Sequence, residues 1–188
     1  MNPWQSQPPA LEPVSLAEAK TYLRVDHGDE DSLISSMITA ARRFAEDYTR
    51  SALIAQQWSL ALDKAPAGRF ITLPRGPVMS VVSIVTVDDN DISTPFDLGQ
   101  VVLSLRDGKV HLKDTASWPT STRVTDGITI TWQAGYGASA SDVPAPIRQA
   151  ILQLVAQMYQ DRSVLPAGAV ATHPTVSLLL SPYRQARI

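Results

Sequence analysis

Apolar residues recur at two different spacings along the chain, and the change of spacing divides the sequence into three parts. From about residue 15 to residue 50 they follow the 3.6-residue period of an amphipathic helix. From about residue 56 to residue 134 they alternate with polar residues in the manner of β-strands, and from residue 142 the helical period returns. This order predicts two helices, then an antiparallel sheet, then a third helix.

The first predicted helix begins with a capping box. Ser15 can accept a hydrogen bond from the backbone amide of Glu18, whose carboxylate can return the bond, an arrangement worth about 1 kcal/mol. Leu16, Ala19 and Leu23 follow at helical spacing. We expect this helix to end near Asp26-His27-Gly28, because glycine tolerates the left-handed conformation that ends helices.

The second predicted helix has three acidic residues, 29–31, in its first turn, where the helix dipole favours negative charge. About 22 residues would form a rod of roughly 33 Å. Its apolar stripe consists of Leu33, Ile34, Met37, Ile38, Ala41, Phe44, Ala45 and Tyr48. The opposite, polar face consists of Arg42, Arg43, Glu46, Asp47 and Arg50.

Five or six short strands are predicted between residues 56 and 134. Trp58, Leu60 and Leu62 alternate with smaller or polar residues in the first of these strands, and residues 127–132 alternate most regularly. Asp107-Gly108 is a strong hairpin signal between Leu105-Arg106 and residues 109–112. The remaining strands are expected at residues 69–73 and 78–87. Strands this short and this closely spaced favour an antiparallel sheet or a small sandwich.

The third helix is predicted to begin at Asp142-Val-Pro-Ala-Pro146 and to bury Ile147, Ile151, Leu154, Val155 and Met158. We therefore expect an α+β protein in which a three-helix bundle-like block, residues 15–55 and 141–162, carries an inserted antiparallel β-subdomain, residues 56–140. Residues 1–14, with four prolines, are predicted to form an extended arm, and residues 163–188 a C-terminal tail.

Composition narrows the range of functions. The chain has 188 residues, no cysteine and a formal net charge of −2, which excludes a disulfide scaffold and a cysteine nucleophile. With 16 Lys+Arg against 18 Asp+Glu it lacks the basic excess of a protein that grips nucleic acid. No apolar run is long enough for a membrane span. Positive charge gathers at the C-terminus, where Arg162, Arg184 and Arg187 follow the last acidic residue, Asp161.

Candidate catalytic and ligand-binding motifs have simpler structural explanations. His27 lies among four acidic residues, but no second histidine follows at ligand spacing. Gly135-Tyr-Gly137 lacks the remaining residues of a phosphate-binding loop, and residues 88–91 are typical of a solvated hairpin turn. His111 has no nucleophile motif to accompany it. We therefore expect no enzyme activity, no cofactor and no metal. Trp58, Trp118 and Trp132 are expected to pack in the core.

Several segments, taken in order, resemble one family. These are Pro13-Val-Ser-Leu-Ala-Glu-Ala-Lys-Thr-Tyr-Leu-Arg-Val-Asp26, Asp29-Glu-Asp-Ser-Leu-Ile34, Ala45-Glu-Asp-Tyr-Thr49, Leu73-Pro-Arg-Gly-Pro-Val78 with Val81 and Ile84, Ala134-Gly-Tyr-Gly137, Asp142-Val-Pro-Ala-Pro-Ile147 with Ala150-Ile-Leu152, and Leu178-Leu-Leu-Ser-Pro-Tyr-Arg184. Together they resemble the phage head–tail connector (adaptor, head-completion) proteins, a family that also occurs in gene transfer agents. The resemblance covers residues 13–162 and 176–184.

The resemblance implies a structural protein made in the bacterial cytoplasm and built into the neck of a virion or phage-like particle. It implies a ring of identical subunits, commonly a dodecamer, that joins the portal protein to a downstream tail or stopper protein. DNA would pass through the channel of the ring without sequence-specific binding, and the net acidity of residues 1–161 suits such a channel. No membrane is involved.

Two sets of residues are candidates for contacts in such an assembly. For the portal or another partner we expect Leu178, Leu179, Leu180, Tyr183, Arg184 and Arg187, which combine apolar anchors with positive charge. The alternative is that residues 176–180 fold back as a short helix onto the chain's own bundle. For contacts between subunits we expect Arg42, Arg43, Glu46, Asp47, Arg50 and Arg148.

A different class of function stays open on the residues alone. A β-sandwich module that binds carbohydrate or protein, carried on a helical stalk, would place its function in the turns at residues 88–91 and 107–108. A hydrolase assembled around His111 is the remaining alternative.

Overall fold

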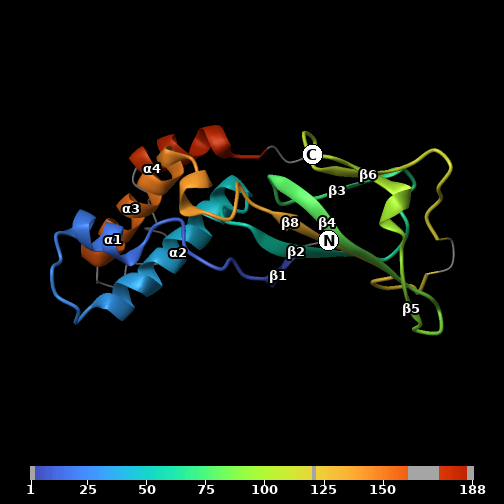
Figure 1. The fold of residues 1–188 in the computed structure, drawn as a ribbon, viewed down its shortest axis with the longest axis horizontal. Helices are drawn as coiled ribbons and strands as arrows, with labels where there is room; N and C mark the ends of the chain where they lie inside the picture. Colours follow the sequence, from blue (N-terminus) through green and yellow to red (C-terminus); the bar gives the residue numbers. More distant parts are fainter. Residues whose placement is uncertain (1–2, 120–121, 161–173, 186–188) are drawn as a thin grey trace. The chain divides into compact units, whose positions relative to one another are not determined.

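The computed structural model describes residues 3–119, 122–160 and 174–185, which form four α-helices and two antiparallel sheets (Figure 1). The predicted α+β class is confirmed. The chain divides into two compact units. A sheet unit comprises residues 1–9 and 55–135, and a helical unit comprises residues 10–54 and 136–188.

The first two helices form as their local sequences dictate, with shifted ends. Helix α1 (Leu16–Leu23) begins with the predicted capping box at Ser15, but it ends before Gly28 because Arg24 adopts the left-handed conformation and its amide donates to the Lys20 and Thr21 carbonyls. Helix α2 (Asp31–Thr49) begins two residues later than expected, and Arg50 ends it in the same left-handed way, with φ of 58°.

Two more helices complete the helical unit. Helix α3 (Ala145–Gln160) packs on α2 and α1, and helix α4 (Pro174–Leu180) packs on α3. Its core consists of Val14, Ala19, Ile34, Ile38, Ala41, Ala45, Leu53, Ile54, Val143, Ile147, Ala150, Ile151, Leu154, Val155, Val176 and Leu180. The predicted stripes of the second and third helices provide half of these residues. Met37, Phe44, Tyr48 and Met158 lie partly buried at its margin.

The larger sheet has five strands in the order β1-β2-β8-β4-β5. Strands β2 (Gln56–Leu62) and β8 (Ile128–Ala134) pair along their whole length, so that Trp58 lies opposite Trp132. Leu60 and Ile130 continue the same buried face, as the alternation predicts. Strand β1 (Trp4–Gln7) pairs with the outer side of β2, within the segment expected to be an extended arm.

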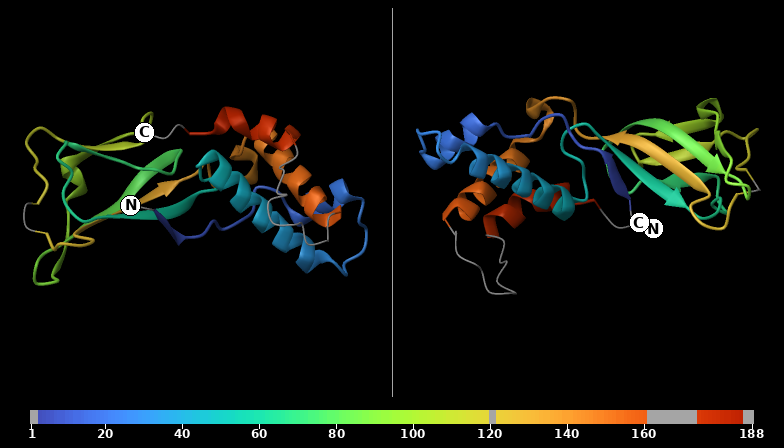
Figure 2. Two further views of the ribbon diagram at one scale, coloured as in Figure 1. Left: turned by 180° about the vertical axis from the view of Figure 1, so that it is seen from behind. Right: turned by 90° about the horizontal axis from the view of Figure 1, so that it is seen from below.

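Strand β4 (Val78–Val87) pairs with the other side of β8. It is ten residues long. Nine of them, residues 78–86, lie opposite the seven residues of β8, and two register shifts absorb the difference. Strand β5 (Ser93–Pro95) pairs only with residues 85–87 of β4. Strands β1, β2, β8 and β4 lie side by side in this order, as the right panel of Figure 2 shows.

The smaller sheet has the order β3-β7-β6 and contains the predicted hairpin in a modified form. Strands β6 (Val101–Ser104) and β7 (Lys109–Leu112) end at a Ser104–Lys109 pair, so Leu105 and Arg106 belong to a four-residue turn rather than to a strand. Gly108 has φ of 60°, a left-handed conformation that suits glycine. Strand β3 (Phe70–Thr72) pairs with the other side of β7.

Candidate assembly interface

The C-terminal segment is anchored in the helical unit. Val176 and Leu180 are completely buried in its core, and Leu179 and Tyr183 pack against that core. Helix α4 and the short 3-10 helix η3 (Ser181–Tyr183) therefore adopt the fold-back arrangement. The prediction that Leu180 contacts a partner is wrong, because burial of this side chain already stabilises the chain's own fold.

What this segment leaves exposed is a smaller set of side chains. Leu178 is 72% exposed, on the helix whose Leu180 is buried. Arg184 is exposed, with its guanidinium carbon 5.7 Å from the centroid of the Tyr48 ring, and the next amide, of Gln185, donates to the Thr49 carbonyl at 2.9 Å. Arg187 lies outside the described residues. Leu178 and Arg184 are thus the predicted contact residues with the greatest access to a partner.

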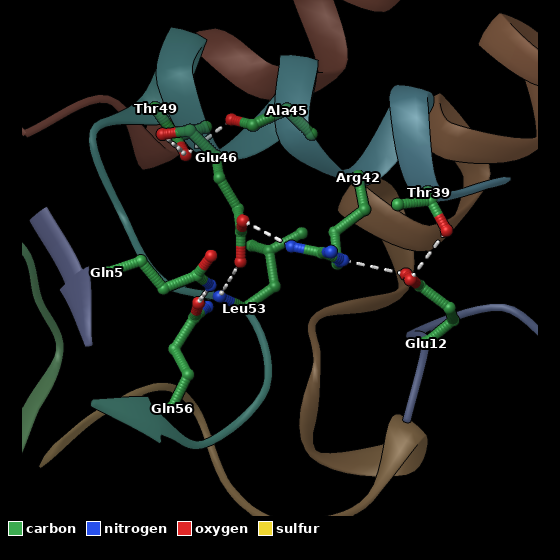
Figure 3. A network of polar contacts seen from close by, with 9 residues as sticks. All are labelled: Gln5, Glu12, Thr39, Arg42, Ala45, Glu46, Thr49, Leu53 and Gln56. Carbon is green, nitrogen blue, oxygen red and sulfur yellow. Dashed lines mark hydrogen bonds and ion pairs between the residues drawn. The ribbon is translucent and has the colours of Figure 1, made fainter. Parts of the chain in front are cut away.

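Only part of the polar face of α2 is exposed to solvent. Arg42 and Glu46 are each 4% exposed, so their assignment as exposed contact residues is wrong. The Arg42 Nε donates to Glu12 and its Nη1 donates to Glu46, both at 2.7 Å (Figure 3). The helical period had placed both residues opposite the apolar stripe, but residues 10–14 and the segment after α2 cover them.

This network ties three segments together. The second oxygen of the Glu46 carboxylate accepts the backbone amide of Leu53 at 3.1 Å, beyond the end of α2. The second oxygen of Glu12 accepts the Thr39 hydroxyl at 2.9 Å. A buried charge needs such partners, because leaving it unpaired costs several kcal/mol. The sequence contained one indication that Glu12 has a structural role, because it is the sole charged residue among the first 14.

The other candidate contact residues differ in access. Arg43 and Asp47 are exposed on α2, whereas Arg50 is half-buried. Arg148 of α3 is engaged within the unit, since its Nε donates to the Pro13 carbonyl at 3.1 Å and its Nη2 pairs with Glu18. Arg43 and Asp47 are therefore the two candidate contact residues on this face that are exposed.

The pKa values of Glu18 and Tyr136 in the helical unit differ from their ordinary values. The Ser15 backbone amide and hydroxyl, with a smaller contribution from Arg148, hold the pKa of Glu18 below its usual value. Burial raises the pKa of Tyr136, and neighbouring Tyr183 raises it further. Both shifts follow from capping and packing contacts.

The remaining candidate motifs are accounted for by local structure. The Asp88 carboxylate accepts the amides of Asn90 and Ile92, both at 2.9 Å, which closes the hairpin turn. A Cβ on Gly137 would come within 2.1 Å of the Asp142 carboxylate, so the absence of a side chain there makes room for a capping acid. His111 lies against the Phe70 ring, with centroids 5.6 Å apart.

The residues considered above for metal binding and for base stacking have equally ordinary surroundings. His27 faces Asp29 at 3.7 Å. Within residues 3–119, 122–160 and 174–185, no three metal-ligating side chains gather. Trp58, Trp118 and Trp132 are buried, as predicted. None of the helices in this part of the chain is long and apolar enough to cross a membrane.

Comparison with known proteins gives one family and a consistent set of structures. The family described as phage gp6-like head-tail connector protein matches residues 13–106. A chain from the neck of an empty GTA particle, computed with C6 symmetry, is similar to this chain with a TM-score of 0.82 and 29% sequence identity. The match covers 100% of this chain and 97% of the neck chain. No curated protein matches.

Two further structures agree. A chain from the virion of a native gene transfer agent (GTA) particle has a TM-score of 0.81 at 27% identity, covering 100% of this chain and 97% of that one. A chain from the neck of a native GTA particle, computed with C12 symmetry, has a TM-score of 0.76 at 28% identity, covering 98% and 97%.

Proposed function

Since the chain belongs to the family of phage gp6-like head-tail connector proteins, a structural component of the neck, we propose that its subunits form a ring that joins the portal protein to a downstream tail or stopper protein. The observation that carries this proposal is the full-length similarity to a GTA neck chain, with a TM-score of 0.82 over 100% of this chain. The family and this similarity together do not favour the alternative of a carbohydrate- or protein-binding module on a stalk.

The proposed ring contains twelve subunits. Similar chains come from necks computed with C12 and C6 symmetry, and a dodecamer is compatible with both. A cyclic ring needs heterologous contacts, in which one surface of a subunit meets a different surface of the next. Arg43 and Asp47, exposed on α2, are proposed to lie in such a contact.

The portal is proposed to bind the exposed part of the C-terminal segment. Leu178 offers an apolar anchor, and Arg184 offers a positive charge held beside Tyr48. Arg187, outside the described residues, adds a further positive charge to the same segment. An exposed leucine and an arginine in the same segment can supply both an apolar anchor and a charged contact, and charge there also speeds association.

DNA is proposed to pass through the ring without being held. All 18 acidic residues of the chain precede residue 162, whereas three of its 16 basic residues follow Asp161. Phosphates bind surfaces rich in lysine and arginine, so a mildly acidic wall lets the duplex slide. We propose a purely structural role, with no catalysis and no cofactor.

The portal contact can be tested by substitutions that leave the core intact. The variant Leu178→Asp with Arg184→Glu is expected to fold normally and to lose binding to portal rings, measured by electron microscopy of the mixed proteins. Leu105→Asp, at a 62% exposed leucine in the sheet unit, is the matched control and should bind as the native chain does. Unchanged portal occupancy by the double variant would contradict this assignment.

A further inference from the structure

One side of strand β4 is left without a partner strand over half its length. Strand β5 pairs only with residues 85–87, and the Ile84 carbonyl accepts the Phe96 amide at 2.8 Å. On this side of Met79–Ser83, no strand pairs with β4 among the residues that the structure describes. Backbone groups on this edge are therefore available to a further strand.

The edge has the composition of a contact surface rather than of a protected edge. None of residues 79–83 is buried, although the strand lies next to the central strand β8. Met79 and Val82 are 39% and 42% exposed, and both fall at the register shifts, where they have no partner in β8. The segment contains no charge and no proline, which are common means of blocking an open edge.

The opposite edge of the same sheet is formed by β1. Residues 4–7 are Trp-Gln-Ser-Gln, also uncharged and without proline. Trp4 is 46% exposed, and β1 pairs with β2 on one side only. The two edges, β1 and the unpaired side of Met79–Ser83, are therefore short and neutral and have exposed apolar side chains.

We propose that β1 of one subunit pairs with Met79–Ser83 of the next, so that the five-stranded sheets of neighbouring subunits join. Strand direction permits this, because β1, β2, β8 and β4 alternate antiparallel, and a second copy continuing the alternation brings its β1 antiparallel to β4. The inference rests on the proposed ring, and it names the two different surfaces that a heterologous contact requires.

A second copy fits the edge better than another occupant. The two edges are of similar length, four residues in β1 and five in Met79–Ser83. Both lack charge, and each has exposed apolar residues that pairing would cover. In a closed ring every β1 edge meets a β4 edge, so that neither of these two edges is left open. The contact uses backbone hydrogen bonds, as in β-strand addition generally.

Cysteine cross-linking tests the pairing directly, because the chain has no native cysteine. One cysteine replaces Gln5 or Gln7, and a second replaces, in turn, each residue from Met79 to Ser83. Within one chain β1 and β4 are separated by two strands, or about 14 Å, which exceeds the roughly 7 Å that a disulfide allows. Any cross-link therefore joins two subunits.

The readout is non-reducing electrophoresis of particles assembled with each double-cysteine variant. We expect a ladder of covalent multimers for those combinations that lie opposite each other. A β1 cysteine paired with Val124→Cys, at a residue 77% exposed in the same unit, should give none. Dimers from a single cysteine in β4 would indicate that like edges pair and would overturn the proposal.

Electron microscopy of the same particles separates the two hypotheses. Intact necks with a cyclic ring but no ladder from any combination would overturn strand pairing and leave the connector function standing. Necks that lack a ring of this chain would overturn the proposed function and the pairing together.

Charged substitutions provide a second, independent test. Met79→Lys with Val82→Lys should leave the urea unfolding midpoint of the purified chain unchanged and abolish incorporation of the ring into particles. Val124→Lys is the matched control and should incorporate normally. Normal incorporation of the Met79, Val82 double variant would contradict the pairing.

Discussion

The Arg42 guanidinium satisfies two carboxylates at once, from Glu12 and Glu46, in a position that is 4% exposed. Glu46 in turn holds the amide of Leu53. Removal of the arginine would take this guanidinium away from the buried Glu46 carboxylate, and the cost of this change exceeds that of losing a surface ion pair.

We therefore predict that Arg42→Ala destabilises the chain by about 3–5 kcal/mol, measured by urea unfolding. Arg43→Ala is the matched control, since Arg43 is exposed on the same helix, and its effect should stay within about 0.5 kcal/mol. Equal effects of the two substitutions would contradict the role of the network.

Glu18 gives a pH dependence whose sign follows from its lowered pKa. The Ser15 bonds hold the folded pKa below the ordinary value of 4.5, so the folded state favours the carboxylate. This contribution to stability is fully present above pH 4.5 and is lost as the pH falls through the lower folded pKa.

We expect the urea unfolding midpoint to fall over that acidic range, and to fall less in Glu18→Gln, which has no titrating group there. Above pH 4.5 the same substitution should cost less than about 1 kcal/mol, because glutamine at this position can still accept the Ser15 amide in the capping box. An acid dependence identical to that of the native chain would exclude Glu18 as a contributor.

At the scale of elements, α4 is a short helix with a structural role and a proposed interaction role. Seven residues are too few to form a stable helix in isolation, so α4 depends on burying Val176 and Leu180 against α3. The same turn of helix leaves Leu178 exposed. We therefore expect substitution of Leu180 to lower stability and substitution of Leu178 to weaken partner binding.

Leu180→Ala is predicted to cost about 2–5 kcal/mol of unfolding free energy, because it removes a completely buried side chain from the core. Leu178→Ala should change stability by less than about 0.5 kcal/mol. Urea unfolding of both variants gives the comparison, and a similar loss in both would mean that the exposed leucine is also structural.

The sheet elements were foreseen unevenly. Strands β2 and β8 have regular alternation, because each buries one face, and their sequences alone indicated them. Strand β6 and the four-residue turn after it were not foreseen in this form, because Asp107-Gly108 reports a turn without fixing the pairing register on either side. Strand β1 carries no alternation of its own and exists through its pairing with β2.

At the scale of the whole molecule, the proposed ring depends on lateral contacts between subunits that each involve few residues. The proposed strand pairing offers about four residues at each edge, and a contact of that size is below the roughly 1,000 Å² of a stable interface. The proposed helical contacts through Arg43 and Asp47 would add to it when a partner holds the subunits side by side.

We predict that the purified chain is a monomer by light scattering and forms a ring only on the portal. The portal raises the local concentration of subunits, so weak lateral contacts become effective. A stable ring in the absence of portal, at micromolar protein concentration, would show that the lateral contacts suffice by themselves.

Local sequence determined which segments of this protein become helices and strands, and the order of its motifs indicated its family. The capping box at Ser15, the stripe of α2 and the alternation of β8 are all set by neighbours within a few residues, and such patterns can be read directly. The α+β class followed from these signals, and the role in a particle neck followed from the resemblance of the ordered motifs to the connector family.

Tertiary structure alone decided which polar residues are internal and which edges stay open. Arg42 is buried because Glu12, thirty residues earlier, and Leu53, beyond the helix end, close over it, and helical periodicity contains no information on such partners. The open edges of β1 and β4 likewise depend on strand order. Burial and pairing are properties of residues far apart in the sequence, and only the folded chain brings them together.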